Sequence, residues 1–428
     1  MPQRKYNQKR CDVTKVSKRI TLPITWAEYQ KLSQDATAFR GWLDQMMATY
    51  PELFPNTIAA GYSLHDILPV SAKMTGVRLR RIRLKTTDEP EPVQVFTIAP
   101  SDVLPYMTGY TDEVEKGLFL RRFGVPFWAL SYVFGRDDGY WYRLSAQLGR
   151  SEIVSTTIKT PDKLPVHLLA DEKHVRFNGH KGYIATTVGA DCILGASLSL
   201  SADEAGLKEA YAQFKAEALA LNPQYEPQTV NTDGWLATQK VWQTLFVTII
   251  VIECFLHAFL KIRDRCQKRW QAVFNDIQQQ VWDIYHASDA HDFRQRMGTF
   301  LQWSQQTVSG TALEAIEKLA AKTDKFVLAF DFPQAHRTSN MIDRHMDPLA
   351  RWLDSARFFH GHWSAAELQI RAWALCHNFG PYCPRAKARQ QFISPAHKLN
   401  GFVYHSNWLH NLLISSSVAG LNSNHRKT

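Results

Sequence analysis

Two short stretches of the chain decide the fold: residues 168–174 read Leu-Leu-Ala-Asp-Glu-Lys-His, and residues 230–235 read Val-Asn-Thr-Asp-Gly-Trp. In each stretch an apolar run typical of a buried strand ends on an aspartate, Asp171 in the first and Asp233 in the second. A single aspartate after a strand is usually a turn or helix cap. Two of them, each closing a strand of one sheet, instead indicate carboxylates that meet at a functional site.

The pattern around these stretches alternates between strands and helices. Strands are predicted over 166–170, 183–188, 192–200, 229–232 and 246–252, and helices over 202–221, 237–245 and 253–266. This order, three strands followed by helix, strand, helix and strand, is that of an RNase H-like core, although other α/β folds come close. Residues 160–266 are therefore expected to form the first part of such a core.

The remaining segments differ in character from this core. Residues 267–325 have helical spacing throughout and predict an all-α insertion. Residues 326–428 are expected to complete the core and form a C-terminal tail, with a β-like segment at 326–332 and helical spacing over 338–375. The predicted fold class is therefore α/β, with the RNase H-like core interrupted by a helical insertion.

Residues 1–155 predict an N-terminal α+β region that binds DNA. Helical spacing covers 26–50, and the β-rich runs 77–85 and 93–98 suggest a hairpin. Three short helices are then predicted, over 113–122, 127–134 and 140–148. They fit a helix-turn-helix, whose second helix would enter the major groove, as well as they fit a plain helical subdomain.

The charge of the chain suits a polyanionic partner without requiring one. The 428 residues carry a formal charge of +10, from 50 Lys and Arg against 40 Asp and Glu. Residues 1–30 are basic, and a second cluster predicts contacts with DNA phosphates, although a basic run is also a common solubilising surface. This cluster comprises Arg78, Arg80, Arg81, Arg83 and Lys85. Lys173, which follows Asp171, could contact the DNA backbone or belong to a charged strand edge.

Several classes of protein are disfavoured by the sequence. The cysteines have no framework spacing, so free thiols in a reducing compartment are expected. No apolar run follows the basic N-terminus, and the most apolar stretch, residues 245–260, is too short to span a bilayer. Phosphate-binding loops of the ATPase or dinucleotide type are absent. A soluble, cytoplasmic protein is therefore expected.

Carboxylates that converge from separate elements suit metal-dependent phosphoryl transfer. Two Mg²⁺ ions about 3.5–4 Å apart can activate water or a 3′-hydroxyl and stabilise the in-line transition state. A rigid sheet fixes the spacing of such ions, and carboxylate oxygens are the ligands that Mg²⁺ prefers. Asp171 and Asp233 fit this requirement.

The chain resembles a known family in the order of five features: Asp171, Asp233, Cys254-Phe-Leu-His257, the helical insertion and Thr338-Ser-Asn340-Met-Ile-Asp343. The family is that of the Mutator-type transposases and related bacterial insertion-sequence transposases, of the kind called DDE. Its members carry two aspartates, a Cys-x-x-His after the next strand, and a Thr-x-Asn-x-x-Glu motif that holds the third acid. The resemblance covers roughly residues 160–375.

The resemblance implies a DNA transposase that binds transposon ends and catalyses metal-dependent cleavage and strand transfer. Asp171, Asp233 and Asp343 would be catalytic and would hold Mg²⁺ or Mn²⁺, two ions in all. His257 would support the site beside the scissile phosphate without binding the metal. The partners would be double-stranded DNA and at least one further copy of the chain, in the nucleoid of a bacterial cytoplasm.

Three points stay open at this stage. The family's third acid is Glu, whereas the chain has Asp343, which is one methylene shorter and could simply suit the start of a helix. Glu314 and Glu317 are alternatives for the third acid. The function could also be that of an RNase H-like nuclease or resolvase without strand transfer, or of a domesticated transposase that only binds DNA.

Overall fold

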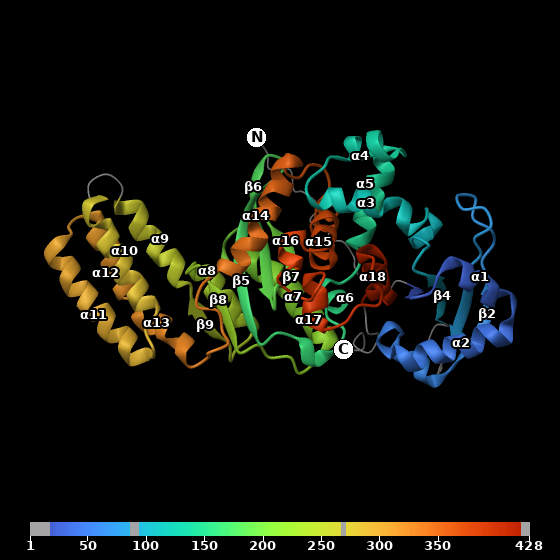
Figure 1. Ribbon diagram of the computed structural model, residues 1–428, viewed down its shortest axis with the longest axis horizontal. Helices are drawn as coiled ribbons and strands as arrows, with labels where there is room; N and C mark the ends of the chain where they lie inside the picture. The colour runs from blue at the N-terminus through green and yellow to red at the C-terminus, as the bar shows by residue number, and fades with distance from the viewer. Residues whose placement is uncertain (1–17, 86–93, 267–270, 421–428) are drawn as a thin grey trace.

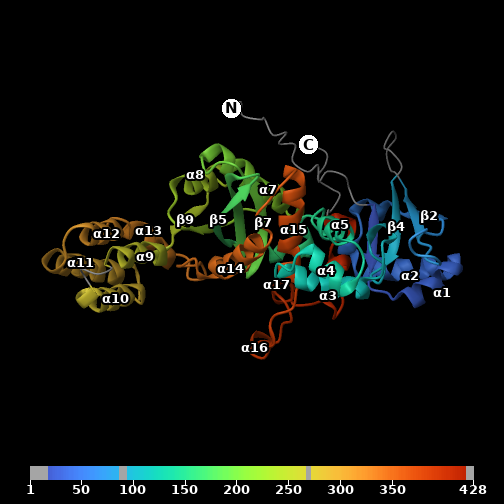
Figure 2. The ribbon, with the colours of Figure 1, turned by 90° about the horizontal axis from the view of Figure 1, so that it is seen from above.

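The structure, a computed structural model, describes residues 18–85, 94–266 and 271–420. Its parts follow one another along an elongated molecule (Figure 1). A small sheet with α1 and α2 lies at one end, a larger sheet flanked by helices lies in the middle, and the helices α9 to α13 lie at the other end. The view from above in Figure 2 keeps the same order of parts.

The N-terminal sheet has the strand order β1-β4-β3-β2, with β1 parallel to β4 and the other pairs antiparallel. Its strands and the two helices that accompany it are β1 (Arg19–Leu22), α1 (Trp26–Gln34), α2 (Ala36–Thr49), β2 (Tyr62–Ile67), β3 (Arg80–Leu84) and β4 (Val95–Pro100). The predicted pair of β-rich runs is the antiparallel pair β3 and β4. The single helix predicted over 26–50 is instead two helices, because Asp35 ends α1 and its side chain caps the amides of Thr37 and Ala38 in α2.

The three short helices predicted before residue 150 are present. They are α3 (Thr111–Arg122), α4 (Phe127–Phe134) and α5 (Asp138–Leu148), followed by α6 (Ile153–Thr157). The bounds of α4 agree with the prediction at both ends. The turn between α3 and α4 contains Gly124, whose φ of 88° is in the left-handed region that glycine tolerates best.

The central sheet mixes antiparallel and parallel strands in the order β7-β6-β5-β8-β9. Its elements are β5 (His167–Phe177), β6 (His180–Gly189), β7 (Cys192–Ser199), α7 (Glu204–Leu221), β8 (Thr229–Thr232), α8 (Leu236–Leu245) and β9 (Ile250–Glu253). The strands β5, β6 and β7 form an antiparallel meander, whereas β8 and β9 run parallel to β5. The chain is thus mixed α/β, as its pattern predicted.

The first strand of this sheet is longer than predicted. The prediction that it ends at residue 170 is wrong, because β5 continues to Phe177 and pairs with β6 along the way. The cause is a tight hairpin at Asn178-Gly179, where both residues have positive φ (49° and 81°) and their sequence is a strong hairpin signal. Asp171 therefore lies within a strand and not at its end.

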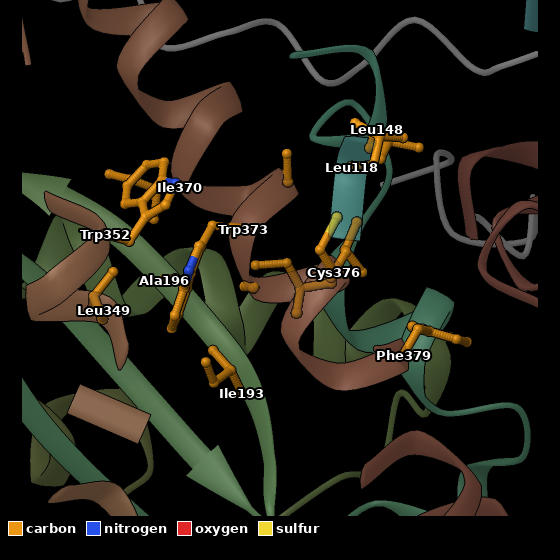
Figure 3. Close-up of a cluster of buried hydrophobic side chains, with 14 of the residues drawn as sticks. Leu118, Leu148, Ile193, Ala196, Leu349, Trp352, Ile370, Trp373, Cys376 and Phe379 are labelled. Atoms are coloured by element: carbon orange, nitrogen blue, oxygen red, sulfur yellow. The ribbon is translucent and has the colours of Figure 1, made fainter. Parts of the chain in front are cut away.

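Helices cover both faces of the central sheet. Alternate residues of β5 point to opposite faces, so Leu168 packs against α7 and α8, whereas Leu169 packs against α14 (Asn340–Ser355) and α15 (Trp363–Phe379). The side chains in Figure 3, which include Trp352 of α14 and Trp373 of α15, fill this second layer. The N-terminal helices α3 and α5 pack on the far side of α15, so α15 is buried along nearly its whole length.

A bundle with its own hydrophobic core follows β9. It consists of α9 (Phe255–Cys266), α10 (Gln271–Tyr285), α11 (Ala290–Thr307), α12 (Thr311–Ala320) and α13 (Thr323–Val327), and the short 3-10 helix η5 (Leu328–Phe330) comes after it. The predicted β-like segment at 326–332 is therefore wrong. A short apolar run fits a strand and a buried helix equally well, and here Phe326 packs into the bundle while Ala329 packs against Ile252 of β9.

The C-terminal part is helical and returns to the N-terminal sheet. The helical spacing predicted over 338–375 is broken between α14 and α15, where Arg357 and Phe358 have positive φ. The last helices are α16 (Pro384–Lys387), α17 (Pro395–Asn400) and α18 (Trp408–Ser415). His410 of α18 bonds to Ser101 beside β4. None of the described helices has the length and apolar character needed to cross a membrane.

Candidate active site

The two aspartates that open the sequence analysis lie side by side. The parallel strands β5 and β8 pair Leu169 with Asn231, and Asp171 and Asp233 each come two residues later. Partners in parallel strands point to the same face, and a step of two residues keeps that face. Both carboxylates therefore lie on the face of the sheet against which α14 packs.

The negative charge of Asp233 affects the ionisation of Asp171. Burial and the negative charge of Asp233 raise the pKa of Asp171 to about 6, and Asp343 adds an effect of the same sign. One oxygen of each aspartate accepts a hydrogen bond from a neighbouring backbone amide. Asp171 Oδ1 accepts from the amide of Glu172 at 2.8 Å, and Asp233 Oδ1 accepts from the amide of Trp235 at 3.0 Å. The second oxygen of each has no hydrogen-bond partner among the described residues.

Asp343 approaches this pair from α14. It lies in the first turn of the helix, where an acid also complements the helix dipole. Its Oδ2 accepts a hydrogen bond from Ser339 Oγ at 3.1 Å. The alternatives Glu314 and Glu317 lie exposed on α12 in the bundle, and the structure does not bring them into this network.

Ser339 joins three predicted residues and was not itself predicted. Its hydroxyl is 3.1 Å from His257 Nδ1 and 3.3 Å from Cys254 Sγ, and its amide donates to Cys254 Sγ at 3.1 Å. Cys254 follows β9, His257 is in the first turn of α9, and Ser339 precedes α14. Because the serine hydroxyl donates its one proton to Asp343, it accepts from the histidine. The position of Ser339 within the quoted Thr-Ser-Asn motif was the only signal for it.

His257 carries a positive charge at neutral pH in this setting. A hydrogen bond with Cys254 is the main reason that its pKa rises to about 9, and the negative charges of Asp343 and Asp233 contribute. Burial opposes ionisation of the Cys254 thiol, but hydrogen bonds from His257 and Ser339 outweigh it and lower the thiol pKa. His257 is therefore an imidazolium beside three acidic groups, those of Cys254, Asp233 and Asp343.

The site's donors fit a divalent cation in part. Asp171 and Asp233 supply free carboxylate oxygens, the hard donors that Mg²⁺ and Mn²⁺ prefer, and a cation between them would relieve their repulsion. Among the described residues, no group of three histidine, cysteine, aspartate or glutamate side chains is close enough to hold a metal ion. Asp343 reaches the pair only through its charge, since its carboxylate is bonded to Ser339.

Two further buried glutamates flank the site on the opposite face. Glu172 accepts hydrogen bonds from Tyr211 and Thr238, both at 2.7 Å, and burial raises its pKa to about 7. Glu253 forms ion pairs with Lys322 and Lys325 of the bundle. Neither was predicted. For Glu172, only the alternation along β5 tells which of the two adjacent acids, Asp171 or Glu172, faces the site.

The predicted DNA-contacting arginines lie on the N-terminal sheet. Arg81 forms a two-pronged ion pair with Asp66, and Arg80 donates to the Ser33 carbonyl at 2.7 Å and lies over the Phe39 ring at 5.3 Å. Two others, Arg78 and Arg83, are exposed. Two of the four arginines, Arg80 and Arg81, therefore have partners within the protein. The sequence alone, which shows only a run of basic residues, could not predict these partners.

Lys173 lies two residues after Asp171 on the same face of β5 and is half-buried. Its place beside the aspartates agrees with a role close to the site.

A scan against protein-family models and a search of curated proteins both found no match to this chain. Function is therefore inferred from the residues of the site.

Proposed function

We propose that the protein is a DNA transposase with an RNase H-like catalytic core, which cleaves transposon ends and transfers them to target DNA. The observation that carries this proposal is the pairing of Asp171 and Asp233 on the adjacent parallel strands β5 and β8. The strand order β7-β6-β5-β8-β9, with an antiparallel meander followed by two parallel strands, supports an RNase H-like core. The bundle of α9 to α13 would be the insertion between β9 and α14.

Each residue of the site has a distinct role in this proposal. Asp171 and Asp233 would hold divalent ions, Mg²⁺ or Mn²⁺, which when bound activate the attacking oxygen and stabilise the phosphoryl transition state. The His257 imidazolium would bind the scissile phosphate by charge and hydrogen bonding. Ser339 would orient His257 and Asp343 together. The half-buried Lys173 would contact the DNA backbone near the cut.

Asp343 would be the third acid after a small change in side-chain position. In the structure its carboxylate accepts a hydrogen bond from Ser339, and it would have to leave this bond to reach a metal ion at Asp171. Asp343→Glu restores the longer acid of the family and should retain or increase cleavage, whereas Asp343→Asn should abolish it. Full activity of Asp343→Asn would place the third ligand elsewhere.

Strand joining tests the function directly. The substrate is labelled DNA that carries the sequences on either side of the gene, where a transposon's inverted repeats are expected, incubated with the full chain and Mg²⁺. The wild-type protein should cleave and join these ends, and Asp171→Asn and Asp233→Asn should do neither while still binding the DNA. Asp264→Asn, at an exposed aspartate of α9, is the matched control and should join ends normally.

The other outcomes separate the competing functions. Cleavage without joining would show a nuclease or resolvase, and DNA binding without cleavage would show a domesticated derivative. Cleavage by Asp171→Asn would remove the site assignment itself. Because two ends must be paired before joining, the active species is proposed to contain at least two copies of the chain on DNA.

A further inference from the structure

A groove of about 550 Å³ lies between the N-terminal helices and the end of α14, away from the paired aspartates. Trp128 of α4 and Tyr142 of α5 line one side of it. Arg357, Phe358 and His360, from the loop after α14, line the other. The positive φ of Arg357 and of Phe358 (50° and 65°) is a backbone strain that often marks a binding site. The groove has the size of a site for a small ligand.

Arg121 lines this groove with a charge that the protein leaves unpaired. The residue is only 8% exposed, and its guanidinium lies 4.4 Å from the centre of the Phe127 ring and 5.3 Å from that of Trp352. Within the described part of the chain it makes one hydrogen bond, to the Val125 carbonyl at 3.2 Å, and its buried Nε has no partner there. No described carboxylate pairs with it, and burial lowers its pKa to about 10.

A buried cation without a counterion costs stability, so its presence needs a reason. An anionic group placed in the groove would supply the missing partner, and a guanidinium binds phosphate oxygens well. Arg357 is exposed beside it and forms no ion pair within the described chain. Of the described residues that line the groove, Asp138 is the one acid.

The groove also offers aromatic surface to solvent. Trp128 is 65% exposed and Tyr142 is 39% exposed. Exposed aromatic rings beside basic groups are the means by which proteins hold single-stranded nucleic acids, because every base has a face that can stack. The groove therefore combines a phosphate partner with a stacking surface.

We propose that this groove, the Arg121 groove, binds one nucleotide, with its phosphate on Arg121 and Arg357 and its base stacked on Trp128. The nucleotide is either free or an unpaired member of a DNA strand. Ser355 of the groove and Asp343 are 12 residues apart on α14, which is about 18 Å at 1.5 Å per residue. The groove is thus a second site, and nucleotide binding there does not require that the protein cut DNA.

Binding of a fluorescein-labelled single-stranded oligonucleotide to the full chain tests this site, in EDTA so that no cleavage occurs. Trp128→Ala removes an exposed ring and should weaken binding about tenfold, within the range for one stacked base. Arg121→Met should weaken binding at least as much. Its melting temperature should stay equal or rise, because the lost charge was buried and unpaired. Tyr132→Ala is the matched control: Tyr132 lies one turn further on α4, is 87% exposed, and does not line the groove.

Competition with thymidine monophosphate and with thymidine identifies the source of the nucleotide. Displacement of the oligonucleotide by thymidine monophosphate but not by thymidine would show a site for free nucleotides. Displacement only by a longer strand would show a site for a nucleotide within DNA, and either result supports the proposal. Wild-type binding by both Trp128→Ala and Arg121→Met would overturn it, as would an equal loss in Tyr132→Ala. The assay measures binding in the absence of a divalent ion, which keeps this test separate from that of the proposed catalysis.

Discussion

At the scale of single residues, Asp171 of the candidate site is buried in a setting that disfavours its ionised form. Burial and the charge of Asp233 raise its pKa to about 6 from an ordinary value of 3.8. Ionisation of Asp171 is therefore less favourable in the folded protein than in the unfolded chain. Such a group lowers stability at neutral pH, which is common where carboxylates await a cation.

The pH dependence of stability should report this effect. Because the folded pKa is the higher one, the contribution of Asp171 is fully present below pH 3.8 and is lost as the pH rises through about 6. Asp171→Asn removes this loss, so its free energy of unfolding should exceed that of the wild type by on the order of 3 kcal/mol well above pH 6, at about 1.36 kcal/mol per pKa unit. Urea unfolding in EDTA across this pH range measures the difference.

The control for this experiment is Asp264→Asn, which changes an exposed aspartate of α9. Its unfolding curves should follow those of the wild type at every pH. A constant difference between Asp171→Asn and the wild type from pH 4 to pH 8 would contradict the electrostatic account of the site.

At the scale of elements, apolar patterning predicted most helices and strands, and its failures have local causes. The run over 127–134 became α4 with unchanged bounds, because Pro126 and Gly135 flank it. The prediction for β5 stopped at the first charged residue, although Val175 and Phe177 continue the alternation on its buried face. The role of Ser339 was missed because two of its partners, Cys254 and His257, are 85 and 82 residues away in the sequence, and the motif around Ser339 does not reveal such contacts.

The turn after β8 holds Asp233 in place and depends on one glycine. Gly234 has a φ of 92°, and a Cβ added to it would clash with the carboxylate of Glu253, which is buried. Gly234→Ala should therefore destabilise the protein by on the order of 2 kcal/mol, from backbone strain and the clash together. Thermal unfolding measures the loss.

Gly298, in the middle of α11, is a glycine whose replacement by alanine should stabilise the protein. It has open space around it and no positive φ, so Gly298→Ala should raise stability by about 0.5–1 kcal/mol through helix propensity. A Gly234→Ala protein as stable as the wild type would show that the turn at Asp233 is not constrained as described.

At the scale of the whole molecule, DNA binding is proposed to involve surfaces far apart in the sequence. Arg83 is exposed on the N-terminal sheet, whereas Arg81 beside it is paired with Asp66. Arg83→Ala should weaken DNA binding and reduce the slope of log K against log salt by about 0.9, since one phosphate contact is lost. Lys208→Ala, at an exposed lysine of α7, is the control. An unchanged slope in Arg83→Ala would remove this residue from the proposed DNA surface.

The pairing of Asp171 with Asp233 as a divalent-metal site is the central claim, and calorimetric titration with Mn²⁺ tests it most directly. The wild-type protein should bind Mn²⁺ at pH 7. Because a small fraction of Asp171 is still protonated at this pH, binding should also release that fraction of a proton. Asp171→Asn and Asp233→Asn should each lose this binding, and Asp264→Asn should retain it. Equal binding of Mn²⁺ by the wild type and by both site variants would contradict the account.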